Sequence, residues 1–413
     1  MKFIVCAKSV LLLAVLLVFN SCNDDDSSTA SPSITGFSPT EGTEGTIVTI
    51  NGKNFSTVTS ENIVKFNGTE ATVTAATATA LTVTVPIGTT TGKITIQLGT
   101  QTITSLNDFV YIPSVYVAGQ EYNGTNGVAK YWKNGIPTSL TDETKESTAT
   151  SIFVAGSDIY VAGNESNGSK TIAKYWKNGA VVNLTDGSNA AYVESIFVAG
   201  NDVYVAGYES NGSRSVAKYW KNGAAVELTD GTQNAKATSI FVAGNDVYVA
   251  GRESNGTNAA AKYWKNGMGV NLSDGLVANS IFVAGSDVYV AGYEYNETDY
   301  LAKYWKNGTA RYLNDAYSAT SIFVAGSDVY VAGYQHKGSV TTCKYWKNEV
   351  SVNIYSSSSG GGLSSIFVIG SDVYVAGSEL AGDYYAAKYW KNGNAVSLTD
   401  GTSHAGATAI YVK

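Results

Sequence analysis

The stretch from residue 239 to residue 275 decides the fold, because it contains one complete unit of a repeat. It begins Ser239-Ile-Phe-Val-Ala-Gly-Asn-Asp-Val-Tyr-Val-Ala-Gly-Arg-Glu253, and it continues through Ala261-Lys-Tyr-Trp264, Lys265-Asn-Gly267 and Gly269-Val-Asn-Leu-Ser273. Short apolar segments separated by turn residues predict four strands joined by tight turns. The first two strands are apolar on both faces, which suits a sheet packed between two neighbours. We expect type I′ hairpin turns at Asn255-Gly256 and Asn266-Gly267, because both central positions of that turn need a positive φ.

Tryptophan marks the period of this repeat along the chain. The seven tryptophans are spaced by 44, 44, 44, 41, 41 and 44 residues, at Trp132, Trp176, Trp220, Trp264, Trp305, Trp346 and Trp390. A four-stranded unit of about this length, repeated in tandem, is typical of the blades of a β-propeller, and a solenoid is the main alternative.

The two ends of the array favour a closed ring over a solenoid. The first unit begins at its second strand, Ser114-Val-Tyr-Val-Ala-Gly119, and the chain finishes on a lone first strand, Ala407-Thr-Ala-Ile-Tyr-Val412. The two halves complete one blade, so the ring has no open strand edge. A solenoid would instead need polar caps at its ends. We therefore predict that residues 113–413 form a seven-bladed β-propeller of four-stranded blades, closed by the C-terminal strand.

Residues 31–112 predict a separate all-β sandwich, because strands rich in Thr, Val and Ile alternate with Gly and Pro turns. The motifs are, in order, Ile34-Thr-Gly-Phe-Ser-Pro39, Gly45-Thr-Ile-Val-Thr-Ile50, Asn51-Gly-Lys-Asn-Phe55, Val64-Lys-Phe-Asn-Gly68, Leu81-Thr-Val-Thr-Val-Pro86 and Gly92-Lys-Ile-Thr-Ile96. In order and spacing this segment resembles an IPT/TIG immunoglobulin-like domain along its whole length. The resemblance implies a spacer or an interaction module.

Residues 1–21 read as a targeting segment, with Lys2 and Lys8 before a short apolar stretch. Phe19-Asn-Ser-Cys22 resembles the lipobox of bacterial lipoproteins, which implies cleavage before Cys22 and lipidation of Cys22. Residues 22–30 then form a flexible acidic and serine-rich linker, in which Asn23-Asp-Asp-Asp26 resembles a signal for the outer face of the outer membrane. The alternatives are an ordinary secretory peptide and a plain solvated linker.

Cysteine content and charge exclude several classes of protein. The chain has three cysteines, and with Cys6 removed and Cys22 lipidated no internal disulfide is possible. Cys343 replaces an alanine of the repeat, so we expect a small buried apolar residue there. Removing the two lysines of residues 1–21 takes the net charge from −7 to −9. We therefore expect no nucleic-acid partner, membrane contact through the lipid anchor only, and a monomer.

The differences between blades indicate where a ligand could bind. The 2–3 hairpins and the 4–1 connections vary, and in an up-and-down blade both emerge on one face of the disc, which we call the variable face. Aromatic side chains with a few polar groups suit the binding of sugar rings or of a protein patch. The alternative is that the sequences of these surface loops vary because no function constrains them. Beside Tyr122, the ligand-binding candidates on this face are Tyr192, Tyr208, Arg252, Tyr293, Tyr295, Tyr300, Tyr317, Tyr334, His336, Tyr384 and Tyr385.

Acidic residues also recur, and turn chemistry explains them better than metal binding. In six blades an Asp lies in the 1–2 turn, as at Asp158, and in six blades another ends the fourth strand, as at Asp142. A calcium site needs several converging oxygens, whereas hydrogen bonding of an Asx side chain within its own turn needs one. A Glu closes the second strand of six blades. Counting from the Asn-Gly turn, Glu165 should face Lys170 and Glu209 should face Arg214 as exposed pairs.

The function that these observations favour is binding without catalysis. We expect a cell-surface lipoprotein of the outer membrane, facing the cell exterior, whose propeller face recognises a glycan or an extracellular protein. We expect no cofactor, no metal and no catalytic residue, since the sequence carries only two histidines and no nucleophile, phosphate-loop or metal-ligand motif. The alternatives are a scaffold or assembly component of an outer-membrane complex, and a carbohydrate-active hydrolase or lyase that uses loop carboxylates.

Overall fold

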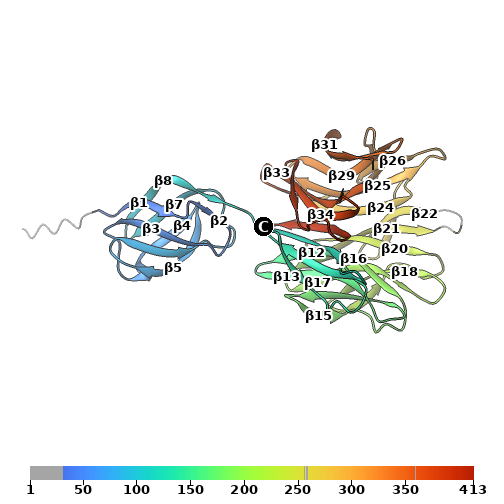
Figure 1. The fold of residues 1–413 in the computed structure, drawn as a ribbon, viewed down its shortest axis with the longest axis horizontal. Coiled ribbons are helices and arrows are strands. Elements are labelled where there is room, and N and C mark those ends of the chain that lie inside the picture. Colours follow the sequence, from blue (N-terminus) through green and yellow to red (C-terminus); the bar gives the residue numbers. More distant parts are fainter. Residues whose placement is uncertain (1–30, 255, 257–258, 359) are drawn as a thin grey trace, which may run out of the picture. The chain divides into compact units, whose positions relative to one another are not determined.

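The computed structural model describes residues 31–254, 256, 259–358 and 360–413, and this part of the chain is built almost entirely of strands (Figure 1). It divides into two compact units, with the boundary between Tyr111 and Ile112. The targeting segment, Cys22 and the linker up to residue 30 lie outside the described residues. Within the described ranges, no helix is long and apolar enough to cross a membrane.

The N-terminal unit is a sandwich whose two halves share strand β5. Its sheet has the order β1-β3-β6-β5-β4-β7-β8-β2, and β5 pairs with β6 on one side and with β4 on the other. Alternating burial along β3 and β6 places Val48, Ile50, Leu81 and Val83 in one core with Phe66 from the opposite half. The elements are β1 (Ser33–Ser38), β2 (Glu41–Gly42), β3 (Ile47–Lys53), the 3₁₀ turn η1 (Thr59–Glu61), β4 (Ile63–Phe66), β5 (Thr69–Ala76), β6 (Ala80–Thr84), β7 (Gly92–Leu98) and β8 (Gln101–Tyr111).

The C-terminal unit is a propeller of seven four-stranded antiparallel sheets, as the repeat predicts. Blade one contains β36 (Ala405–Val412), β9 (Val115–Tyr122), β10 (Gly127–Lys133) and β11 (Ile136–Ser139). Blade two contains β12 (Ser147–Ala155), β13 (Asp158–Ser166), β14 (Thr171–Lys177) and β15 (Ala180–Asn183). Blade three contains β16 (Ala191–Ala199), β17 (Asp202–Ser210), β18 (Ser215–Lys221) and β19 (Ala224–Glu227).

The remaining four blades follow the same order of strands. Blade four contains β20 (Ala235–Ala243), β21 (Asp246–Ser254), β22 (Ala259–Lys265) and β23 (Met268–Asn271). Blade five contains β24 (Val277–Ala284), β25 (Asp287–Tyr295), β26 (Tyr300–Lys306) and β27 (Thr309–Tyr312). Blade six contains β28 (Ser318–Ala325), β29 (Asp328–Lys337), β30 (Val340–Lys347) and β31 (Val350–Ser357), and blade seven contains β32 (Gly361–Ile369), β33 (Asp372–Ala381), β34 (Tyr384–Lys391) and β35 (Asn394–Ser397).

The C-terminal strand closes the ring, which confirms the argument from the ends of the array. Strand β36 pairs antiparallel with β9, from Ala405 opposite Glu121 to Val412 opposite Val115. Ser114 and Lys413 exchange backbone hydrogen bonds of 2.7 and 3.0 Å at the end of this ladder. In Figure 1 the C-terminus accordingly lies beside the teal strands that begin the propeller. First and last strands of the array therefore share one sheet.

The repeated tryptophans pack between blades. Each is at most 2% exposed. Trp220 of blade three belongs to one buried cluster with Tyr160 and Ala162 of blade two. Trp132 of blade one likewise shares a buried cluster with Tyr374 of blade seven, so this packing also continues across the closure. Burying a large aromatic side chain in every interface is what holds neighbouring blades together.

The first strand of each blade lines the centre of the ring. Its aromatic residue contacts the equivalent residue of the next blade, with ring centroids 4.8 to 5.1 Å apart. These contacts form an unbroken circle of Phe153, Phe197, Phe241, Phe282, Phe323, Phe367 and Tyr411. First strands are thus innermost, and side chains near their starts lie close to the central opening of the variable face.

The two kinds of Asn-Gly turn differ. Asn266 and Gly267 have φ of 51° and 83°, as a type I′ turn requires, so that prediction is confirmed. Asn255 lies outside the described residues, but the equivalent loop of blade two differs from the prediction. Gly168 has a φ of 96°, whereas Asn167 does not have a positive φ and its side chain accepts hydrogen bonds from the backbone of Ser169 and Lys170. This loop therefore has four residues, and Ser166 pairs with Thr171.

Candidate functional site

A β-bulge at the same place in every blade shapes the central opening. The extra residue lies in the first strand, and the residue before it faces a glycine of the second strand, as Val193 faces Gly207 in blade three. A Cβ at Gly207 would collide with the carbonyl oxygen of Tyr192, so the close approach requires glycine. Bulges re-aim neighbouring side chains and are frequent beside functional sites. The bulged residues are Thr150, Glu194, Thr238, Asn279, Thr320, Ser364 and Thr408.

The residue that follows each glycine occupies one position around the opening, and its identity varies from blade to blade. We call this set the rim. The rim residues are Gln120, Asn164, Tyr208, Arg252, Tyr293, Tyr334 and Ser378. The backbone of the blades is constant here while the chemistry changes, which is the pattern expected of a binding surface on a rigid scaffold.

Blade five carries a cluster of three tyrosines on the variable face. Tyr300 lies edge-on to rim residue Tyr293, with ring centroids 5.6 Å apart and an interplanar angle of 78°. Tyr300 also contacts Tyr295 at 5.0 Å and Tyr317, from the connection to blade six, at 4.8 Å. Burial raises the pKa of Tyr293, and the charge of nearby Arg252 opposes this shift.

Blade six extends the cluster without a break. Tyr317 stacks on rim residue Tyr334, with centroids 5.8 Å apart and an angle of 25°. His336 contacts both rings, at 4.7 and 5.1 Å, and its Nδ1 is 2.9 Å from the hydroxyl of Thr341. Such ring contacts fix the orientation of the side chains.

Blades three and four continue the surface with charged groups. Tyr192 stacks on rim residue Tyr208, with centroids 5.1 Å apart and an angle of 22°. Lys236 lies over the Tyr208 ring, with Nζ 4.3 Å from the centroid, and donates a 3.1 Å hydrogen bond to its hydroxyl. Arg252 is directly opposite Lys236 in the strand register. We call these residues of blades three to six together the tyrosine arc: Tyr192, Tyr208, Lys236, Arg252, Tyr293, Tyr295, Tyr300, Tyr317, Tyr334 and His336.

Close to the arc lies a residue that sequence reasoning missed, Glu194. At the same bulge position Thr238 and Thr408 donate hydrogen bonds to backbone carbonyls, whereas the described residues offer no hydrogen bond or ion pair to Glu194. Burial raises the pKa of the Glu194 carboxyl to about 7, and the Lys236 charge acts against this rise. An alignment of the seven repeats would have shown Glu194 as the one acidic residue among Thr, Ser and Asn.

Two of the candidate residues lie in a separate cluster. Tyr384 and Tyr385 contact His404, at 5.0 and 5.9 Å. The backbone N–H of Tyr385 donates a 3.2 Å hydrogen bond to Nδ1 of His404. Tyr385 and His404, together with Tyr122, line a pocket of about 420 Å³ between blades seven and one. In the described part of the chain, no ring contact joins them to the tyrosine arc.

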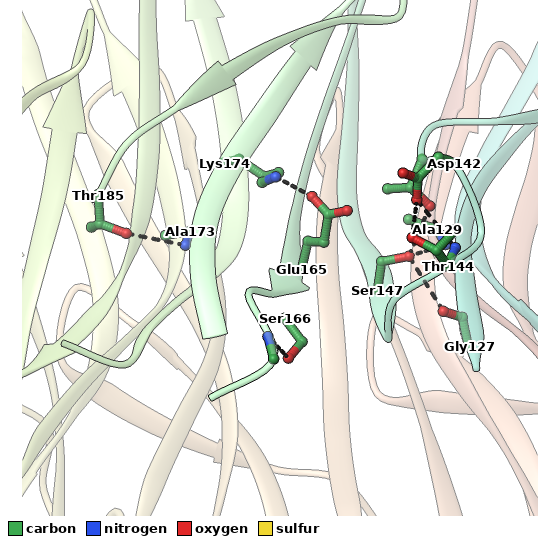
Figure 2. A network of polar contacts seen from close by, with 12 residues as sticks. Gly127, Ala129, Asp142, Thr144, Ser147, Glu165, Ser166, Ala173, Lys174 and Thr185 are labelled. Atoms are coloured by element: carbon green, nitrogen blue, oxygen red, sulfur yellow. Dashed lines mark hydrogen bonds and ion pairs between the residues drawn. The ribbon is translucent and has the colours of Figure 1, made fainter. Parts of the chain in front are cut away.

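The repeated glutamates do not form the predicted pairs. Glu165 pairs with Lys174 and Glu209 with Lys218, the lysine of the Lys-Tyr-Trp motif, rather than with Lys170 and Arg214. Figure 2 shows Lys174 and Glu165 pointing toward each other from neighbouring strands. The prediction was wrong because the hairpin loop has four residues, which moves the register of the third strand. These lysines are largely buried, so the glutamates neutralise their charge and have a structural role within the blade.

The aspartates of the 1–2 turn were also assigned the wrong partners. Asp158 forms an ion pair of 2.8 Å with Lys177 and accepts a 2.8 Å hydrogen bond from Asn178, and these contacts lower its pKa. Equivalent ion pairs recur through blade seven. Four of the aspartates after the fourth strand do accept a hydrogen bond from the backbone N–H two residues on, as in an Asx turn: Asp142, Asp186, Asp230 and Asp400. Among the described residues, no group of His, Cys, Asp and Glu is placed to hold a metal ion.

Cys343 is fully buried, and burial raises the pKa of its thiol, which confirms a packing role.

Comparison with known proteins concerns the N-terminal unit first. Residues 32–111 match the family model of the IPT/TIG domain. No curated protein matches the chain.

Solved structures from Bacteroides resemble the chain distantly. A protein of unknown function from Bacteroides thetaiotaomicron is 11% identical, with 92% of this chain and 98% of that chain covered and a TM-score of 0.44. An auxiliary nutrient binding protein from the same organism is 13% identical, with 89% and 85% covered and a TM-score of 0.29. Another, from Bacteroides ovatus, is 14% identical, with 78% and 85% covered and a TM-score of 0.33. Likenesses at this level carry no argument about function. Residues 32–111 are thus an IPT/TIG domain, and a seven-bladed β-propeller follows it.

Proposed function

We propose that the propeller is a binding module whose tyrosine arc recognises a saccharide. The observation that carries the proposal is the unbroken set of ring contacts from Tyr293 through Tyr300 and Tyr317 to Tyr334. Sugar rings present flat C–H faces that pack on aromatic rings, while their hydroxyls hydrogen-bond to phenol, amine and guanidinium groups at the edge. The arc offers both kinds of contact.

The side chains of the arc are also preorganised for binding. Most of its tyrosines are half-buried, and Tyr295 is 50% exposed. Contacts between rings restrict their rotation, so binding would require little further ordering of side chains. The rigid circle of first strands beneath them adds to this preorganisation.

Catalysis is a second candidate, favoured by Glu194 alone. A half-buried carboxyl with a pKa of about 7 could act as a general acid or base. Glycoside hydrolysis, however, needs a second carboxylate beside the first. Incubation with saccharides that bind, followed by product analysis, tests this candidate. Turnover by the wild type that Glu194→Gln abolishes would replace the binding proposal with a catalytic one.

A glycan array probed with the full chain tests the binding function. We expect a restricted set of saccharides to bind the wild type, and Tyr300→Ala to lose them because the centre of the arc is removed. Tyr384→Ala is the matched control, since Tyr384 is an aromatic residue of the same face outside the arc. Absence of any saccharide binding would contradict the proposal.

The proposed setting is the outer surface of a bacterial cell. Cys22 would anchor the chain, residues 23–30 would form a tether, and the IPT/TIG domain would serve as a spacer. We expect Cys22→Ala to release the protein from membranes, and protease added to intact cells to remove the wild-type propeller. A propeller that survives this digestion would contradict the outward orientation.

A further inference from the structure

A pocket at the junction of blades three and four opens beside the tyrosine arc. Its volume is about 390 Å³. Lys236 and Arg252 from blade four line it, together with Ser215 from blade three and Ser254 from blade four. Asn234 lies at its wall, where its side chain accepts a 3.0 Å hydrogen bond from the backbone N–H of Ser215.

The two cations of this pocket face each other without a counterion. Lys236 is directly opposite Arg252 in the ladder, and like charges directly opposite each other are unfavourable. Burial and the charge of Arg252 lower the pKa of the Lys236 ammonium. Within the described residues, neither side chain lies within ion-pair distance of a carboxylate.

This pair contrasts with the other lysines of the repeat. Lys218 and Lys221 of blade three both form ion pairs of 2.8 Å, with Glu209 and Asp202. The acidic group whose charge affects the pKa of Lys236 is Glu194, which lies beyond ion-pair distance and whose own pKa is about 7. The pocket is therefore locally positive in a chain whose net charge is −7.

Neighbouring rings define where the rest of a ligand would lie. Tyr208 borders the pair on the blade-three side, through the contact of its ring with Lys236. Tyr293 is the rim residue of the next blade after Arg252. An anion bound by Lys236 would thus lie close to an aromatic residue of the arc, Tyr208.

We propose that Lys236 and Arg252 bind the acidic group of an anionic saccharide, either a carboxylate or a sulfate ester. This inference rests on the proposed function and specifies the class of saccharide. Arginine offers two parallel N–H donors that match a carboxylate or sulfate, and lysine adds a point charge. An anion here also removes the repulsion between the two cations, which a neutral sugar cannot do.

Titration calorimetry with the full chain tests the inference. The probes are oligosaccharides of glucuronic acid, of 6-sulfated glucose and of glucose, matched in length and linkage. We expect at least one acidic probe to bind ten times or more tightly than the neutral one. Arg252→Gln should abolish most of this preference, and higher salt should reduce it in the wild type. Comparing the two acidic probes distinguishes carboxylate from sulfate recognition.

Arg214→Gln is the matched control, because it removes an exposed arginine from the blade-three hairpin without touching the pocket. Equal binding of acidic and neutral probes, or a preference that survives in both Arg252→Gln and Lys236→Gln, would overturn the inference. Binding of neutral probes that Tyr300→Ala abolishes would then leave the proposed function intact. If no saccharide of any kind binds, both fail together. Melting curves of each variant show whether a loss of binding reflects a loss of folding.

Discussion

Glu194 is held in a position that favours its protonated form. Its pKa rises from 4.5 to about 7 because burial penalises the carboxylate, and the Lys236 charge offsets part of this penalty. Between these two values the folded state binds more protons than the unfolded state, so the free energy of unfolding falls as the pH rises. The contribution of Glu194 to the free energy of unfolding is therefore least favourable above pH 7.

Replacing Glu194 by threonine tests this reading. Threonine at the same bulge in blade four hydrogen-bonds to Ala250 and Ala278, so Glu194→Thr should gain similar bonds and lose the buried carboxyl. We expect a gain of about 1–3 kcal/mol at pH 8 and a smaller gain at pH 4, measured by urea unfolding.

A buried lysine in blade six lacks the carboxylate that other blades supply. Lys344 is 6% exposed, and Gln335 replaces the glutamate of the repeat. In the described ranges no ion pair reaches Lys344. Gln335→Glu should therefore raise the free energy of unfolding by about 1–2 kcal/mol, since a partner is restored to a buried charge.

Glu253→Gln is the reciprocal change, because it leaves Lys262 of blade four in the situation of Lys344. We expect it to lower stability in the same urea assay. If Glu253→Gln is stabilising, or Gln335→Glu is destabilising, the desolvation penalty of the buried carboxylate is larger than the stabilisation from its ion pair with lysine.

At the level of the strand, a serine links the inner strands of neighbouring blades at six of the seven junctions. The backbone N–H of Ile240, for example, donates a 3.2 Å hydrogen bond to Oγ of Ser195 in the preceding blade. The same bond joins blades two through seven and reaches Ile410 of blade one through Ser365. At the last junction Ala409 occupies the serine position, so Ile152 has no such hydroxyl to bond.

Restoring that serine should strengthen the closure. We expect Ala409→Ser to raise the free energy of unfolding by about 0.5–1.5 kcal/mol, the usual net value of one hydrogen bond. Ser239→Ala, which removes the equivalent bond to Ile281, should lower it by a similar amount. Thermal or urea unfolding measures both. No gain from Ala409→Ser would mean that the closing junction already satisfies Ile152 in another way.

Loop length explains which contacts between strands the sequence could not predict. Counting from Asn167-Gly168 as a two-residue turn placed Glu165 opposite Lys170. In the structure Asn167 begins a four-residue loop, and the partner becomes Lys174. The Asn-Gly dipeptide therefore adopts one backbone conformation in the 2–3 hairpin and another in the turn between the third and fourth strands. The dipeptide alone does not distinguish the two conformations, because they depend on the tertiary context.

Over the whole molecule, the architecture was predictable because each repeat shows where its four strands begin and end. The tryptophan period and the match between the first and last strands predicted seven blades and their closure, and β36 pairs with β9 accordingly. The grouping of the loop residues was less predictable. The arc joins blades three to six, whereas Tyr384 and Tyr385 turn toward His404. The repeats show that Glu194 is acidic where other blades have Thr, Ser or Asn, but the bulge that places it beside the central opening is not visible in the sequence.

The saccharide-binding arc is the central claim about the whole molecule, and calorimetric titration tests it most directly. The titrant is the saccharide that binds best on the glycan array, and the proteins are the wild type, the double variant Tyr300→Ala/Tyr317→Ala, and Tyr384→Ala, each shown to fold by its melting curve. We predict that the double variant weakens Kd by tenfold or more, about 1.4 kcal/mol or more, while Tyr384→Ala binds as the wild type does. An unchanged Kd in the double variant, or an equal loss in Tyr384→Ala, would contradict the account.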